Sequence, residues 1–150
     1  KRRNSTIARE AYFLDYAANI KKTISIPVIV TGGFRTRNAM ESAIGNNACE
    51  MIGVGRPLCA DPLSIKKLLS GEIEQLSRYE KSLSFGPWIF SPSSPFRLIQ
   101  AINGFGAQAW FYQQIKRISR NEVPDLNMSV FAALRKDLAE DVAAVKALKG

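Results

Sequence analysis

Two short glycine turns are the parts of this sequence best suited to chemistry. Gly32 and Gly33 follow an apolar run at residues 27–31, and Gly55 and Arg56 follow a second such run. Backbone N–H groups exposed at a turn beside a helix start bind anions, and a guanidinium suits bidentate contact with a phosphate. One helical segment separates the two runs, so both turns are expected at the same end of adjacent parallel strands. The sequence therefore predicts a phosphate site built from both turns.

Each candidate residue also has a plainer interpretation. Glycine is the default residue of any tight turn, and Arg56 could instead form an ion pair at the rim of a barrel. Phe34, which follows the first turn, could pack against a flat cofactor ring or simply fill the core. Arg35 and Arg37 are expected to be solvated or to steer a phosphate. It is the pairing of the two turns that favours phosphate binding over these alternatives.

The spacing of apolar residues predicts the elements that position the two turns. Residues 6–22 are expected to form an amphipathic helix, and residues 27–31 a strand covered on both faces. A short helix capped by Thr36 then leads to a second strand at 51–54. Gly53 within that strand suggests a close backbone approach or a tight barrel interior.

The remainder of the chain is predicted to be mainly helical. The pair Asp61-Pro62 is typical of a helix start, and Gly71 of a helix end. An irregular loop at 84–97, rich in proline and serine, marks a boundary. Two helices are then expected, at about 106–120 and at about 128–149, the second with apolar residues at heptad-like spacing.

The order strand, glycine turn, helix, strand, glycine turn is found in (β/α)8 barrels, whose loops after strands seven and eight usually bind phosphate. A complete barrel needs about 250 residues, so this chain of 150 residues cannot close one alone. The predicted fold class is α/β: the C-terminal part of a (β/α)8 TIM barrel, comprising strands seven and eight with their helices, plus a helical C-terminal tail. The expected division is barrel units at 1–83 and an irregular loop with a helical tail at 84–150.

Charge and composition narrow the possible functions. The chain has 21 Lys and Arg against 13 Asp and Glu, a net charge of +8, concentrated in residues 1–37. A solvated helix face and a phosphate-binding turn explain this excess, so nucleic-acid binding is not expected. Because the chain has no histidine, we predict neither a catalytic residue nor a metal ligand. Two cysteines without Cys-x-x-Cys spacing, and no apolar run of about 20 residues, favour a reduced, cytoplasmic protein without a membrane partner.

Three motifs lie within residues 5–70: Arg-Glu-Ala-Tyr-Phe-Leu at 9–14, Val-Thr-Gly-Gly-Phe-Arg at 30–35 and Ile-Gly-Val-Gly-Arg-Pro-Leu at 52–58. Together they resemble the Old Yellow Enzyme family of NADH:flavin oxidoreductases. The family has an FMN-containing (β/α)8 barrel that reduces activated alkenes or enones with hydride from NAD(P)H. The resemblance implies that FMN is the cofactor and that its phosphate is held by Gly32, Gly33, Gly55 and Arg56, with Phe34 as the candidate for a ring contact.

The resemblance also implies that the isolated chain is inactive. The family's substrate-binding pair, which contains histidine, and its tyrosine proton donor have no counterpart here. The expected role is thus a C-terminal fragment that contributes the FMN phosphate site. Two alternatives stay open: a dihydrouridine-synthase-like flavin barrel acting on tRNA, and a noncatalytic remnant or helical interaction module. In the latter, the helix at 128–149 would be the partner surface, and the C-terminal helices could also join two copies in a homo-oligomer.

Overall fold

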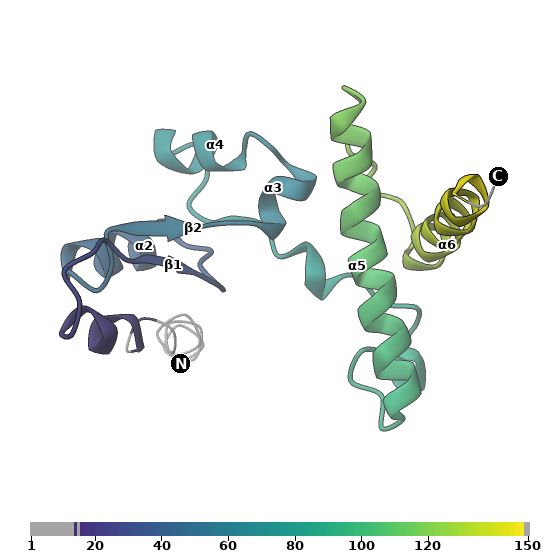
Figure 1. Cartoon of the computed structure of the whole chain (residues 1–150), viewed down its shortest axis with the longest axis horizontal. Helices are drawn as coiled ribbons and strands as arrows, with labels where there is room; N and C mark the ends of the chain where they lie inside the picture. Colours follow the sequence, from purple (N-terminus) through teal and green to yellow (C-terminus); the bar gives the residue numbers. More distant parts are fainter. Residues whose placement is uncertain (1–13, 15, 149–150) are drawn as a thin grey trace. The chain divides into compact units, whose positions relative to one another are not determined.

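The computed structural model describes residue 14 and residues 16–148, which fall into two compact units (Figure 1). The first unit is Lys1–Leu58 with Leu63–Ser77, and the second is Cys59–Pro62 with Arg78–Gly150. Helices and a two-stranded parallel sheet make the chain a mixed α/β structure, as predicted at that level. The functional division expected at residue 84 stays a prediction.

A parallel strand pair forms the centre of the first unit. Strand β1 (Ile29–Thr31) pairs with strand β2 (Met51–Gly53), and helix α2 (Arg37–Gly45) connects them (Figure 1). Both strands are shorter than predicted, because residues 27, 28 and 54 lie outside the ladder. Thr36 occupies the position before α2, as expected, although its side chain makes no capping hydrogen bond. Residues 16–21 are helical, and the predicted start of that helix lies outside the described residues.

Only one face of the sheet is covered within the described residues. Val30 is buried in a cluster of apolar side chains from both flanking helices, the turn after β1 and the segment before β2, namely Ala17, Phe34, Ala43 and Cys49. The flanking strand residues Ile29 and Met51 are 60% and 57% exposed. The prediction of a strand covered on both faces is therefore wrong for this chain, because both helices pack on the side of Val30.

A polar clamp holds the edge of the sheet where the strands begin. Glu50 accepts a hydrogen bond from the backbone N–H of Val28 at 2.7 Å and forms an ion pair with Lys21. Lys21 also donates to the amide oxygen of Asn47 at 2.8 Å. The hydrogen bond from Lys21 is the main cause that lowers the pKa of Glu50 below its usual value. The clamp thus ties the end of the first helix to the start of both strands.

Two short helices follow β2, and the first was not predicted. Helix α3 (Arg56–Ala60) begins directly after Gly55, and helix α4 (Ser64–Ser70) follows a turn. The prediction of a helix start at Asp61-Pro62 is wrong by two to three residues, because the chain turns at 62–63 after α3 before it becomes helical again. The predicted end is confirmed, since Gly71 caps α4 in the left-handed conformation with φ 79°.

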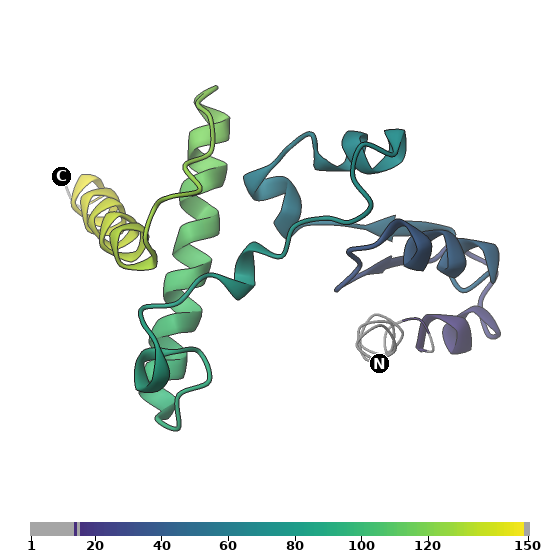
Figure 2. The same cartoon turned by 180° about the vertical axis from the view of Figure 1, so that it is seen from behind.

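Two long helices dominate the second unit. Helix α5 (Arg97–Ser119) packs against helix α6 (Val130–Ala147), with the short 3-10 helices η1 (Tyr79–Lys81) and η2 (Trp88–Phe90) before them. Figure 2 shows the segment around η2 folding back along the first turns of α5. The core contains Ala60, Leu83, Ala109, Trp110, Val130 and Ala133. No helix in the described ranges is long and apolar enough to cross a bilayer.

Helix α5 begins nine residues before its predicted start at 106. Glycine and asparagine at 103–106 weaken the helical pattern in the sequence, but tertiary contacts hold them in the helix. The Asn103 amide donates to the carbonyls of Phe90 and Ile99 at 2.9 and 2.8 Å, and its oxygen accepts from the Phe85 N–H at 3.1 Å. Gly106 lies against Phe85 and Val130, where a side chain would not fit.

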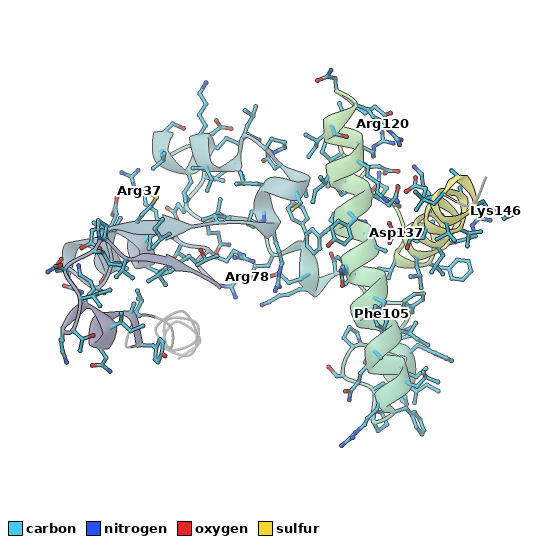
Figure 3. All side chains as sticks on the ribbon, viewed as in Figure 1. Arg37, Arg78, Phe105, Arg120, Asp137 and Lys146 are labelled. Carbon is cyan, nitrogen blue, oxygen red and sulfur yellow. The ribbon has the colours of Figure 1, made fainter. Side chains whose placement is uncertain are left out.

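A half-buried polar network joins α5 to α6. Lys116 donates to Asp137 at 2.9 Å and to Glu140 at 2.6 Å, and the buried Gln113 donates to Glu140 at 3.0 Å. Asp137 lies on the side of α6 that faces α5 (Figure 3). Hydrogen bonding to Lys116 and then Gln113 lowers the pKa of Glu140, and bonding to Glu140 and Asp137 raises the pKa of Lys116.

Two glycines of α5 provide a matched test of the packing. Gly106→Ala would place a methyl group 2.6 Å from the Phe85 ring, whereas Gly104 has no atom within 4 Å of the corresponding position. We expect Gly106→Ala to lower the free energy of unfolding by about 1–3 kcal/mol through overpacking. Gly104→Ala should raise it by about 1 kcal/mol through helix propensity. Urea unfolding followed by fluorescence reports on this unit, because both tryptophans lie in it. Equal effects of the two substitutions would contradict the packing described.

The polar network predicts a dependence of stability on pH. Since folding lowers the pKa of Glu140, its contribution is complete above the ordinary carboxyl pKa and is lost as the pH falls through the lowered value. Glu140→Gln should therefore cost up to about 1 kcal/mol at neutral pH and progressively less in acid. Glu72→Gln, at an exposed carboxyl outside the network, is the control and should change little. A Glu140→Gln deficit that persists unchanged in acid would exclude this linkage.

Candidate functional site

The parallel register brings the two glycine turns to one edge of the sheet. Ile29 pairs with Met51, Val30 with Ile52 and Thr31 with Gly53. Thr31 and Gly53 are the last residues of their strands. The chain therefore leaves both strands at the same level and the same edge, as the sequence predicted.

The first turn adopts a backbone that favours glycine. Gly32 has φ 131° and Gly33 has φ 76°, both in the region that side chains disfavour. Gly33 is exposed and Gly32 half-buried. The turn can thus present backbone groups to a ligand without a side chain in the way.

The residues after this turn anchor it to the protein. Phe34 is buried in the apolar cluster beneath β1, so of its two predicted roles the structure provides the packing one. Arg35 is also buried, and its guanidinium donates to the Phe34 carbonyl at 2.8 Å. The expectation that Arg35 is solvated is therefore wrong. Arg37 is exposed, as expected, and pairs with Glu41 at 2.7 Å.

A segment that sequence reasoning missed completes the anchor. The N–H of Leu76 donates to the Arg35 carbonyl at 2.7 Å, and Thr36 forms an isolated antiparallel bridge with Gln75. Leu76 is itself buried. Two apolar residues in the polar stretch after Gly71, Ile73 and Leu76, were the one signal in the sequence, and two residues are too few to establish a period. These contacts hold the first turn in one conformation.

The second turn is open and carries an exposed cation. Gly55 is exposed, with no atom within 4 Å of the place where a side chain would begin. Its carbonyl accepts from the N–H of Leu58 at 2.9 Å, which fixes the first turn of α3. Arg56 is the first residue of α3 and is exposed. Neither α2 nor α3 carries an acidic residue in its first turn.

Gly53 leaves room for the side chain of Thr31, its partner in the neighbouring strand. A Cβ atom on Gly53 would overlap the hydroxyl of Thr31, its partner in the ladder, and would lie 3.0 Å from the Thr31 Cβ. The group that approaches Gly53 is thus a side chain and not the backbone that the sequence suggested, and the tight barrel interior stays a prediction. The edge therefore combines two glycine turns, one exposed guanidinium and helix starts free of carboxylates, an arrangement that can bind an anion.

The known proteins similar to this chain are reductases and flavin oxidoreductases. It is 43% identical over 61 residues to the NADH-dependent flavin oxidoreductase iliE of Hypocrea jecorina, covering 40% of this chain and 15% of that protein. It is 29% identical over 116 residues to the NADH-dependent flavin oxidoreductase iccE of Talaromyces variabilis, covering 75% of this chain and 27% of that protein. It is 44% identical over 57 residues to the bilirubin reductase of Mediterraneibacter gnavus, covering 38% of this chain and 9% of that protein.

This chain thus spans between 9% and 27% of the length of these relatives. No family model matches it, and no solved structure matches it. Over the matched stretches the chain is similar to NADH-dependent flavin oxidoreductases, which confirms the resemblance predicted from its three motifs.

Proposed function

We propose that this chain forms the C-terminal βα units of an FMN-dependent oxidoreductase of Old Yellow Enzyme type and supplies its FMN phosphate site. The observation that carries the proposal is the strand register, which puts both glycine turns and the exposed Arg56 at one edge. The similarity to NADH-dependent flavin oxidoreductases supports a flavin as the ligand.

In this proposal β1 and β2 are strands seven and eight of a (β/α)8 barrel. The exposed face of the sheet, with Ile29 and Met51, would then point into the barrel, where layers of branched and bulky apolar side chains fill the interior. The covered face, with Val30 beneath α2, would be the outer side. Two βα units of a barrel, taken without its other strands, would form a two-stranded parallel sheet whose inner apolar face is uncovered. The sheet of this chain has that form.

The residues at the site fit a phosphate group. Gly32 and Gly33 would offer N–H donors from a turn with positive φ, which glycine adopts without strain, and the open space at Gly55 would admit a phosphate oxygen. Arg56 would donate two parallel hydrogen bonds. Phe34, being buried, would support the turn from beneath rather than stack on the flavin ring.

Bound FMN would supply the hydride-transfer chemistry, and this chain would hold and orient it. We propose NADH or NADPH as the hydride donor, with NADH favoured by the names of the relatives, and an activated alkene or enone as substrate. Without histidine, the chain itself provides no acid–base group of the expected kind, so the isolated chain would be inactive. We place the protein in the cytoplasm, in keeping with Cys49 and Cys59, which form no disulfide.

Arg56 offers the sharpest test of the phosphate site. The protein to use is a hybrid in which this chain replaces the segment that it matches in the Hypocrea jecorina relative. Once that hybrid binds FMN, Arg56→Ala should weaken binding by about 1.5–3 kcal/mol, the usual contribution of a charged hydrogen bond. Lys66→Ala removes one exposed positive charge from α4 and should leave the FMN dissociation constant unchanged. Fluorescence titration of FMN measures both; equal affinities would exclude Arg56 from the site.

The requirement for the remaining strands can be tested with the chain alone. We expect the 150-residue chain to retain no flavin on gel filtration and to oxidise no NADH in the presence of an enone. The hybrid should be yellow and active. A yellow, active preparation of the isolated chain would show that the missing barrel strands are not needed.

A further inference from the structure

Helix α6 has two separate faces. One is partly apolar and partly polar and packs against α5, and the other is apolar and exposed. Val130 and Ala133 are buried against α5, and Asp137 and Glu140 continue that face through the polar network. The second face consists of Phe131, Leu138, Val142 and Val145, which are 65%, 56%, 54% and 50% exposed. At 100° per residue the two faces point about 130° apart around the helix. The Phe85 ring packs edge-on against Phe131 at a centroid distance of 6.5 Å, and the four side chains still stay at least half exposed.

The exposed face has the spacing of a coiled-coil seam. Steps of seven, four and three residues separate Phe131, Leu138, Val142 and Val145. This assigns Val142 to a heptad a position and the other three to d positions. A β-branched residue at a with leucine at the neighbouring d favours two-stranded, parallel association. We propose that α6 docks through this face onto α6 of a second copy of this chain, as a short parallel coiled coil.

The charges beside the seam fit a second copy. Asp141 falls at a g position and Lys146 at the e position five residues later. In a parallel pair these positions face each other across the seam, so each copy's Asp141 meets the other's Lys146 on both sides. Both residues are exposed, and neither forms an ion pair within the described ranges. Lys146 lies on the outer side of α6, away from α5 (Figure 3).

Arg135 and the length of the helix set the strength of the dimer. Arg135 falls at an a position, where a single charged residue fixes register at a cost in stability. Helix α6 has 18 residues and is thus about 27 Å long, so the seam is short. The interface lies at the small end of the range for specific complexes. The dimer is therefore weak, and its population depends on concentration.

Sedimentation equilibrium of the full chain tests the seam. Leu138→Glu puts a charge in its centre and should raise the dimer dissociation constant at least about tenfold. Lys136→Glu introduces the same residue at an exposed position of α6 outside the seam and should leave the constant within about twofold. Unchanged circular dichroism would show that both variants keep their helices. A monomeric wild type, or equal effects of both variants, would overturn the proposal.

A charge exchange and a crosslink test the partner and the orientation. Asp141→Lys and Lys146→Asp should each weaken the dimer, and the double variant should restore it. In a Cys59→Ser background, Val145→Cys at a d position should form a disulfide between copies, which only a parallel pair permits. Burial raises the pKa of the native Cys49 thiol, which keeps it slow to react. Failure of the double variant to recover, or no crosslink in a dimeric sample, would overturn the proposal.

Discussion

The contact between Thr31 and Gly53 is the constraint on which the candidate site depends. These residues are partners at the ends of two parallel strands, and the Thr31 side chain occupies the space that a side chain on Gly53 would need. A shift of register by one residue would turn Val30 out of its apolar cluster. The register therefore fixes where both strands end, and with it the level at which the two glycine turns meet.

The two edges of the sheet differ in a way that suits binding at only one of them. Where the strands begin, Lys21 donates to Asn47 and pairs with Glu50, and Glu50 accepts a hydrogen bond from the backbone of Val28. The polar groups of this edge therefore bond to one another. Where the strands end, the chain has the two glycine turns and the exposed Arg56. Buried contacts of Phe34 and Arg35 still hold that edge from beneath. These contacts fix the backbone of the first turn before any ligand binds, which is the condition for a preorganised anion site.

Features that depend on local pattern could be predicted from the sequence, and features that depend on tertiary contact could not. The β-branched run around Val30, the glycine turns and the end of α4 at Gly71 follow from residue types alone. The start of α5 could not be predicted, because Asn103 and Gly106 are poor helix formers that only Phe85, Phe90 and Val130 explain. The anchoring of Arg35 could not be predicted either, because its carbonyl bonds to the N–H of Leu76, about forty positions away, in a segment that no periodicity marks.

Local pattern predicts the α6 helix, but only tertiary contact decides which of its two faces packs against α5. The sequence predicts a helix with apolar residues at heptad-like spacing, and it offers that helix as a partner surface only in one of the alternatives. In the structure α5 instead takes the small and polar face of Ala133, Asp137 and Glu140, because Lys116 and Gln113 fix the polar contact there. A polar network that selects one face of a helix for its neighbour leaves the more apolar face free. The specificity of the α5 and α6 contact is therefore what makes an apolar surface available to a second chain.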